Sequence, residues 1–357
     1  MVSIRLRQLD TSFDISDKGT IEQLLSSAGL CEGVFDQSFA TFLPSVIVQG
    51  DALGKGVSSC VHRVLIRGKA VQSASRDELD CEDGLSGDFA MKCIHKVEDA
   101  QREQLFLEGL HGNRIQHNNL LMTYCGFSVG EKYYTISDRA NMDLKELFTK
   151  VNASQIGVDA RWVREQFHDL ADALRCIHDF NPGSQTACLN DIKPANLLIF
   201  GDRRPTLKFT DWGHTTISDK PRRGSGVNFM LGDASYQPPE CCEVLTSRQY
   251  DIWSLGCVFI ELLVWFDKGT RGYQQFFDAR GRLHALHDIQ ANAFYHDGKI
   301  EGSVMRELMD LESGSGCWAD IVGVIRDMLK IKPKERPTAE YIGNIGLCVS
   351  CAQCMLQ

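Results

Sequence analysis

The sequence has no run of apolar residues long enough to cross a membrane. Its most apolar stretch, YDIWSLGCVFIELLVWF at residues 250–266, is shorter than the roughly 20 residues that span a bilayer. The first ten residues, MVSIRLRQLD, contain no apolar core of the kind found in secretory signal peptides. We therefore expect residues 250–266 to form a buried helix, and we expect an intracellular chain, cytoplasmic or nuclear, without a membrane span.

The sequence also lacks an excess of positive charge. Lys and Arg number 38 against 47 Asp and Glu, which gives a formal net charge of −9. Nucleic acids and anionic lipids attract basic surfaces, so this balance argues against both as non-specific partners. Internal repeats and low-complexity tracts are absent as well, and a hydrophobic content of 43% is ordinary for a globular chain with a sizeable core.

Cysteine is abundant, with 14 residues, but its distribution does not indicate a disulfide framework. Several cysteines lie in apolar stretches, as Cys93 and Cys257 do, and we expect these to be free and to pack as small hydrophobic residues. Cys348, Cys351 and Cys354 form a C-x-x-C-x-x-C cluster. For this cluster metal binding, lipid attachment and packing from a last helix remain open, and packing is favoured.

Hydrophobic patterning divides the chain into a strand-rich first part and a helix-rich second part. Residues 1–45 predict one short helix, at 20–30, and residues 68–88 are polar and predict an exposed loop. Apolar alternation and β-branched residues predict strands at 46–56, 58–68 and 89–95 and two strands within 119–137, while helical spacing is found at 97–110 and 162–180. This order predicts an α+β fold of two packed lobes, with the ligand in the cleft between them.

A glycine turn joins the first two predicted strands. It reads G-x-G-x-x-S-x-V, from Gly54 and Gly56 to Ser59 and Val61. Glycines at such a turn allow backbone N–H groups to approach phosphates closely. An ordinary hairpin explains the same residues equally well, so the turn alone does not establish a phosphate site.

Lys92 lies on the strand that follows the polar loop. Its ammonium group can bind α- and β-phosphates if a helix carboxylate holds it in place. Glu103 and Glu108 both compete for that role, but five residues correspond to about 140° around a helix, so only one can point inward. We favour Glu103, because apolar residues follow it at helical spacing.

The run DIKPAN at residues 191–196 has the D-x-K-P-x-N spacing of a phosphotransferase catalytic loop. A carboxylate at Asp191 can accept the proton of an attacking hydroxyl, and Lys193 can neutralise the transferring phosphoryl group. Asn196 can bind Mg²⁺, and Asp211, which follows a predicted strand, can ligate the same metal. Each of these residues alone is weak evidence for a phosphotransferase site. Their order along the chain, after a lysine on a strand, is much stronger evidence.

These motifs together resemble a eukaryotic protein kinase domain from about Val46 to Cys354. The similarity continues in Pro238-Pro239-Glu240, in the D-x-W-S-x-G run that begins at Asp251, and in Arg336, which is expected to pair with Glu240. In style the chain is similar to kinases of filamentous fungi. The resemblance implies an N-lobe at about 46–137, a hinge at 138–141 and a C-lobe at 142–354, preceded by an N-terminal extension at 1–45.

The resemblance also implies the reaction and the nucleotide site. The form of the catalytic loop is that of serine/threonine kinases, which transfer the γ-phosphate of ATP to a protein hydroxyl with Mg²⁺. ATP and a protein substrate are therefore the expected partners, while the oligomeric state is left open. The resemblance also implies the adenine-binding residues. Val61, Ala90 and Leu198 would enclose the adenine ring, Ser137 is the gatekeeper behind the adenine pocket, and Asp138 and Ala140 belong to the hinge.

The chain departs from the family pattern at several positions. Leu189 and Asn190 replace the His and Arg that usually precede the catalytic Asp, and Trp212 replaces the Phe after the metal-binding Asp. Ser59 replaces a third glycine, and Asp233 stands where serine/threonine kinases usually carry Thr. The pseudokinase scaffold is therefore the alternative to an active kinase, and a small-molecule phosphotransferase is a third hypothesis.

Overall fold

The computed structural model describes residues 47–56, 58–67, 86–129, 132–219, 232–241, 247–284, 289–314 and 318–346. The helix expected at 20–30, most of the polar loop and the Cys348, Cys351 and Cys354 cluster lie outside these residues. The chain divides into two compact units. One runs to Leu107 and resumes at Leu121–Arg139, and the other comprises Glu108–Leu120 and the chain from Ala140 onward.

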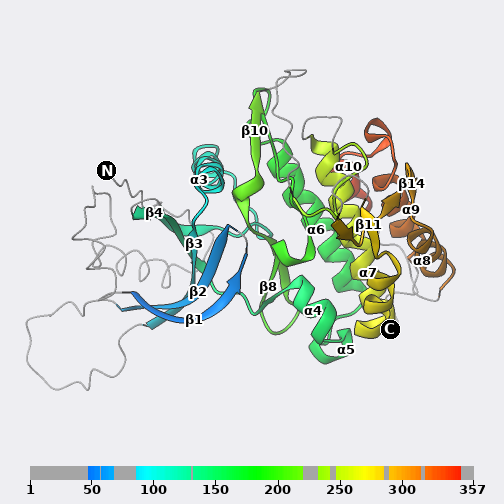
Figure 1. Cartoon of the computed structure of the whole chain (residues 1–357), viewed down its shortest axis with the longest axis horizontal. Helices are drawn as coiled ribbons and strands as arrows, with labels where there is room; N and C mark the ends of the chain where they lie inside the picture. Colours follow the sequence, from blue (N-terminus) through cyan, green and yellow to red (C-terminus); the bar gives the residue numbers. More distant parts are fainter. Residues whose placement is uncertain are drawn as a thin grey trace, which may run out of the picture. The chain divides into compact units, whose positions relative to one another are not determined.

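The first unit is built on an antiparallel sheet with the strand order β1-β2-β3-β5-β4 (Figure 1). Its strands are β1 Ile47–Lys55, β2 Ser59–Arg67, β3 Ser86–Ile94, β4 Thr123–Val129 and β5 Lys132–Asp138. Val61 pairs with Lys92, and Ala90 pairs with Ser137. Directly paired residues share a face and alternate residues return to it, so all four lie on one face of the sheet.

Helix α3, Val97–Gly112, packs on the same face of this sheet. Ala100 forms a buried apolar cluster with Ile94 of β3 and Tyr133 of β5, and Ile94 lies two residues from Lys92 on that strand. The helix crosses the division between the units, because its last turn from Glu108 belongs to the second unit. In that last turn, a side chain at Gly109 would collide with the ring of Phe180.

The second unit is mainly helical. Its helices are α4 Leu144–Lys150, α5 Ala153–Ile156, α6 Ala160–His178, α7 Arg248–Ala279, α8 Gly302–Ser313, α9 Ala319–Met328 and α10 Ala339–Gly346. Asp159 begins α6 by accepting a hydrogen bond from the Trp162 N–H at 2.8 Å. The stripe predicted for this helix is buried throughout, and its Phe167 stacks on Phe259 of α7 with ring centroids 3.8 Å apart.

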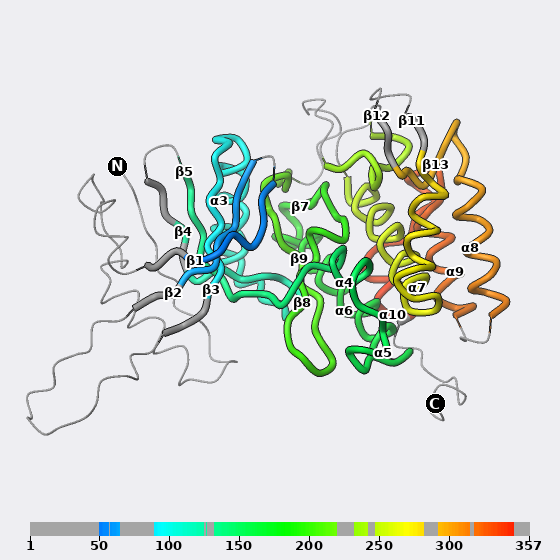
Figure 2. Tube along the Cα trace, turned by 60° about the horizontal axis from the view of Figure 1, so that its bottom comes forward, coloured from blue at the N-terminus to red at the C-terminus, as the bar shows by residue number. Residues whose placement is uncertain are grey.

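Helix α7 is the longest helix of the described residues and is buried along residues 250–265. The helix expected at 250–266 is therefore present, but it continues to Ala279 after a break at Gly269, whose φ is 67° and ψ is −172°. A side chain at Gly269 would collide with Asn152, and Asn152 accepts the Thr270 N–H at 2.9 Å. Figure 2 shows α8 and α9 beside α7.

Short strands flank the segments that carry the predicted chemistry. β6 Met142–Asp143, β8 Leu197–Phe200 and β9 Thr206–Phe209 form one sheet, and β7 Gln185–Cys188 pairs with β10 Thr216–Asp219. Two further hairpins follow α7: β11 Arg282–His284 with β12 Ile289–Ala291, and β13 Tyr295–His296 with β14 Lys299–Ile300. Residues 189–196 thus lie between β7 and β8, and each of these strands is paired with another strand of the second unit.

The α+β fold class is confirmed: within the described residues, the first unit holds a sheet and most of α3, and the second unit is mainly helical. Within the residues that the structure describes, no helix is both long enough and apolar enough to span a bilayer.

Candidate active site

The segment that carries Asp191 is held in place by hydrogen bonds to Asp251 of α7. Asp251, fully buried near the start of α7, accepts the backbone N–H groups of Leu189 and Asn190 at 2.9 and 2.8 Å. His178 Nε2, at the end of α6, lies 3.0 Å from the same carboxylate. Asn190 takes a left-handed conformation, with φ of 64°, which asparagine tolerates better than most residues. These contacts fix the direction in which the Asp191 side chain leaves the chain.

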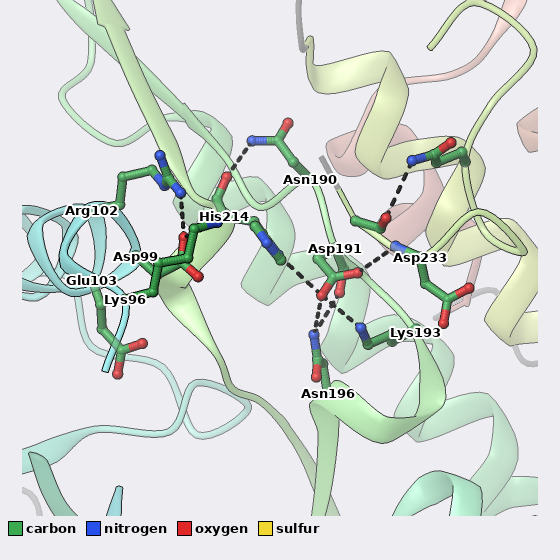
Figure 3. A network of polar contacts seen from close by, with 12 residues as sticks. Lys96, Asp99, Arg102, Glu103, Asn190, Asp191, Lys193, Asn196, His214 and Asp233 are labelled. Carbon is green, nitrogen blue, oxygen red and sulfur yellow. Dashed lines mark hydrogen bonds and ion pairs between the residues drawn. The ribbon is translucent and has the colours of Figure 1, made fainter. Parts of the chain in front are cut away.

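The Asp191 carboxylate is the centre of a polar network (Figure 3). Its Oδ2 accepts hydrogen bonds from Lys193 Nζ at 2.8 Å and Asn196 Nδ2 at 2.9 Å, and His214 Nδ1 lies 3.2 Å away. Its Oδ1 accepts the backbone N–H of Asp233 at 2.9 Å. An ionised carboxylate offers about two acceptor sites on each oxygen, and among the residues that the structure describes Oδ1 accepts only the Asp233 N–H, which leaves one site on Oδ1 for a further donor.

Lys193 is held in its charged form. Burial acts to lower the pKa of the Lys193 ammonium group, but the nearby carboxylates of Asp191, Asp233 and Asp211 raise it above its ordinary value. The nearby carboxylates therefore favour the charged form of the Lys193 side chain beside Asp191.

Asn196 and Asp211 lie at the ends of paired strands and offer oxygen atoms. Leu197 pairs with Phe209, and the Thr210 N–H donates to the Asn196 carbonyl at 3.0 Å, which brings the two sites together. Asn196 uses its amide nitrogen on Asp191, so its amide oxygen can serve as a ligand. A carboxylate and an amide oxygen are the hard ligands that Mg²⁺ prefers, and the residues present fit that metal.

Two residues at this network were not predicted from the sequence. His214, directly after Asp211-Trp212-Gly213, places its ring at Asp191. Gly232 has a φ of 87°, and a side chain there would lie 2.5 Å from the Asn190 carbonyl and 3.1 Å from Asp191 Oδ1. Their sequence signals were only a polar residue following Asp211-Trp212-Gly213 and a glycine before Asp233.

Three of the positions that depart from the kinase pattern, Leu189, Asn190 and Trp212, lie in the interior. Leu189 and Trp212 are buried. The amide nitrogen of Asn190 contacts the carbonyl oxygens of Cys188 and His214 and the Thr216 hydroxyl, at 3.0, 2.8 and 3.1 Å.

Asp233 serves the loop through its backbone more than through its side chain. Its N–H holds Asp191, as described above, and its Oδ1 accepts the Ser235 N–H at 2.9 Å. Asp233 itself is exposed. Its carboxylate therefore caps a turn and adds to the negative charge that raises the Lys193 pKa.

In the first unit, Lys92 pairs with Glu103. Lys92 Nζ lies 2.6 Å from Glu103 Oε2, and the Glu103 side chain is only 2% exposed. Glu108, the other candidate, is exposed one and a half turns further along α3. Val61, Ala90 and Ser137 share the sheet face of Lys92, as the strand register requires.

The glycine turn closes the hairpin between β1 and β2. Gly56 N–H donates to the Ser59 carbonyl at 2.8 Å, and a side chain at Gly54 would meet nothing within 4 Å. The geometry therefore leaves open space at Gly54 without distinguishing a phosphate-binding turn from an ordinary hairpin.

The remaining predicted nucleotide residues are divided between the units. Ser137 is buried and its hydroxyl contacts the Asp138 carbonyl at 3.3 Å, while the Asp138 carboxylate accepts the Tyr124 hydroxyl. Ala140 and Leu198 lie in the second unit and are half-buried. The pair expected further along is present: Arg336 Nη1 and Nη2 bind Glu240 at 2.6 and 2.7 Å.

Comparison with known proteins gives the family. A sequence model described as "Protein kinase domain" matches residues 80–345, which is more than half of the chain. CBL-interacting protein kinase 26 of Oryza sativa subsp. japonica is 29% identical over 202 residues, which cover 55% of this chain and 36% of that protein. CBL-interacting serine/threonine-protein kinase 15 of Arabidopsis thaliana is 28% identical over 182 residues, covering 49% of this chain and 40% of that protein.

A third relative matches more of the chain. Dual specificity protein kinase TTK of Mus musculus is 22% identical over 297 residues, which cover 78% of this chain and 29% of that protein. The matched segments span less than half the length of each of these three relatives. Given the match over residues 80–345, the chain belongs to the protein kinase family.

Proposed function

We propose that this chain is a transferase that moves the γ-phosphate of ATP to serine or threonine hydroxyls of proteins, in a Mg²⁺-dependent reaction. The observation that carries the proposal is the Asp191 carboxylate. Lys193, Asn196, His214 and the Asp233 backbone hold it, and the described part of the chain leaves one acceptor site on Oδ1.

The remaining acceptor site gives Asp191 its role in the reaction. A substrate hydroxyl that donates to Oδ1 is oriented for attack, and Asp191 accepts its proton as the new ester bond forms. Lys193, kept cationic by three neighbouring carboxylates, stabilises the negative charge of the transferring phosphoryl group. Bound Mg²⁺ would neutralise the phosphates of ATP, and the oxygen atoms of Asn196 and Asp211 would hold it.

Residues of the first unit supply the binding groups for the nucleotide. Lys92, fixed by Glu103, would bind the α- and β-phosphates. Gly54 and Gly56 would approach the phosphates through their backbone. Val61, Ala90, Ser137 and Asp138 would contact the adenine, and Ala140 and Leu198 are proposed adenine contacts as well.

The choice of acceptor rests on the loop and on the relatives. The D-x-K-P-x-N form is that of serine/threonine kinases, and one of the three relatives carries serine/threonine in its name while another is named a dual specificity kinase. The match to the protein kinase domain favours a protein over a small molecule as the acceptor.

A pseudokinase scaffold is the second candidate, favoured by the crowding of Asp191 Oδ2. Three groups surround that oxygen, and His214 adds one that the family pattern does not lead us to expect. If the carboxylate served only to stabilise the loop, the chain would bind ATP and not transfer its phosphate.

The test of the proposed function compares ATP binding with autophosphorylation, in wild type and Asp211→Asn. We expect the wild type to bind ATP in a Mg²⁺-dependent way and to label itself, and we expect Asp211→Asn to lose both the metal dependence and the labelling. Tight Mg²⁺-dependent binding without any labelling of the wild type would favour the scaffold.

A further inference from the structure

Three side chains that bind transition metals converge on the sheet of the first unit. Cys60 Sγ lies 3.4 Å from His95 Nε2, and Cys93 Sγ lies 3.6 Å from His95 Nδ1. The candidate ligand atoms of all three residues lie within 4.8 Å of one another. None of these residues belongs to the proposed nucleotide or catalytic machinery.

The strand register places this group on the face opposite the nucleotide residues. Cys60 of β2 pairs directly with Cys93 of β3. Their neighbours Val61 and Lys92, also directly paired, point to the other face because side chains alternate along a strand. His95 follows β3 two residues after Cys93, and its N–H is bonded to the Ser58 carbonyl at 2.9 Å. The backbone pairing of β2 with β3 therefore fixes the positions of Cys60, Cys93 and His95.

The spacing of the three side chains is compatible with a tetrahedral zinc site. With Zn–S bonds of about 2.3 Å and Zn–N bonds of about 2.0–2.1 Å, the ligand atoms of a tetrahedron lie roughly 3.5–3.8 Å apart. The two sulfur–nitrogen distances of 3.4 and 3.6 Å are close to this range. Only one ring nitrogen can bind the ion. The three ligand atoms lie within 4.8 Å of one another, so the exposed His95 side chain would have to move until one nitrogen lies near both sulfurs.

We propose that Cys60, Cys93 and His95 bind one Zn²⁺ ion, with a water molecule in the fourth position. Two thiolates and an imidazole are a ligand set that zinc favours. Binding releases the thiol protons and forms two Zn–S bonds and one Zn–N bond, with no change in oxidation state. The exposure of His95 leaves the fourth position open to solvent.

Tyr134 of β5 supports the site from outside the ligand set. It pairs with Cys93 in the sheet, and its hydroxyl forms a hydrogen bond with the Cys93 sulfur. Such outer partners orient a ligand, and their loss typically costs about 10–100-fold in metal affinity. Tyr134 is therefore a positioning residue of the proposed site.

A disulfide between Cys60 and Cys93 is the competing outcome. Directly paired residues of an antiparallel sheet have Cα atoms about 4.5–5.5 Å apart, which a disulfide can bridge. A disulfide, however, gives no role to His95, whose two ring nitrogens approach one sulfur each. The convergence of an imidazole on both thiols favours the ion.

The experiment measures zinc binding to the full chain in a background that removes the second cysteine cluster. Cys348, Cys351 and Cys354 are replaced by serine, and the protein is purified under reducing conditions. Zinc content is measured by mass spectrometry of the metal, and Co²⁺ titration reports thiolate ligation through its charge-transfer absorption.

We expect one zinc ion per chain and a thiolate–Co²⁺ band in this background. Tyr134→Phe should lower the affinity about 10–100-fold, and Cys60→Ser, Cys93→Ser and His95→Ala should each lower it further. Cys176→Ser, a half-buried cysteine of α6, is the matched control and should leave the affinity unchanged.

Three results would overturn the proposal. They are the absence of zinc and of the Co²⁺ band in folded protein, an affinity that His95→Ala leaves unchanged, or a Cys60–Cys93 disulfide as the resting state under reducing conditions. Circular dichroism of each variant shows whether the fold persists, and His95, being exposed, provides a variant that does not disturb the core.

Discussion

At the scale of single residues, the site depends on how the four acceptor positions of the Asp191 carboxylate are used. Lys193 and Asn196 come from the same loop, so their contacts follow from the local sequence. His214 and the Asp233 backbone come from segments more than twenty residues away. The catalytic motif could thus be predicted from spacing, whereas these two contacts depend on tertiary structure.

The contact of His214 with Asp191 predicts a specific kinetic effect. Replacing His214 with Ala removes one of three groups at Oδ2, and a hydrogen bond worth about 0.5–1.5 kcal/mol corresponds to roughly a 2–10-fold loss. We expect kcat to fall by that amount while KM for ATP stays unchanged. His214→Asn, whose amide can donate to the same oxygen, should recover part of the loss; a kcat for His214→Ala equal to that of wild type would contradict this role.

The environment of Asn190 predicts that kinase activity does not depend on phosphorylation of the segment that follows Asp211. Both N–H groups of the neutral Asn190 amide are engaged with Cys188, His214 and Thr216. An amide also cannot form the charged, bidentate hydrogen bonds that an arginine forms with a phosphate.

We therefore expect alanine at four hydroxyl positions together to leave kinase activity largely intact: Thr215, Thr216, Ser218 and Ser225. Ser225 lies outside the described residues. The lost hydrogen bond at Thr216 should cost about 1 kcal/mol of stability. Abolished activity in a folded quadruple variant would refute the prediction, and circular dichroism would establish that the variant is folded.

At the scale of secondary-structure elements, hydrophobic periodicity predicted the sheet strands, α3, α6 and the buried part of α7. It could not predict that α7 resumes after Gly269, because the break depends on Asn152, more than a hundred residues earlier in the sequence. Periodicity also left Glu103 and Glu108 as alternatives. The packing of α3 decided between them, since Lys92 contacts Glu103.

An ion pair between α6 and α9 predicts a pH dependence of stability. Arg164 Nη1 and Nη2 bind Asp320 Oδ2 and Oδ1 at 2.7 and 3.0 Å. Partial burial acts to raise the pKa of the Asp320 carboxyl, but the hydrogen-bonded Arg164 guanidinium outweighs it and lowers the pKa below 3.8. The pair therefore contributes fully above about pH 3.8, and its contribution is lost as the pH falls through the lower folded-state pKa.

The measurement is the free energy of unfolding of wild type and Asp320→Asn by denaturant. Because Asp320 is well exposed, the difference at about pH 6 should be on the order of 1 kcal/mol or less. It should shrink as the pH is lowered toward about 2. A difference that is constant over this range would show that the ion pair does not set the stability.

At the scale of the whole molecule, family membership followed from the order of weak motifs rather than from any single one. Lys92, Asp191, Asn196 and Asp211 occur in the kinase order, and the match over residues 80–345 includes all of them. The sequence could not predict how its unusual residues would be accommodated. Leu189 and Trp212 are buried, and Asp233 contributes a backbone N–H that any residue except proline could supply.

The central claim is that Asp191 is a working catalytic carboxylate. The most direct measurement is the transfer of radiolabelled γ-phosphate from ATP to generic protein substrates, in wild type and in Asp191→Asn. We predict Mg²⁺-dependent labelling of serine and threonine by the wild type and a reduction of about 10²–10⁴-fold in Asp191→Asn, with ATP binding preserved. Equal labelling by both proteins, or no labelling by a wild type that binds ATP, would contradict the claim.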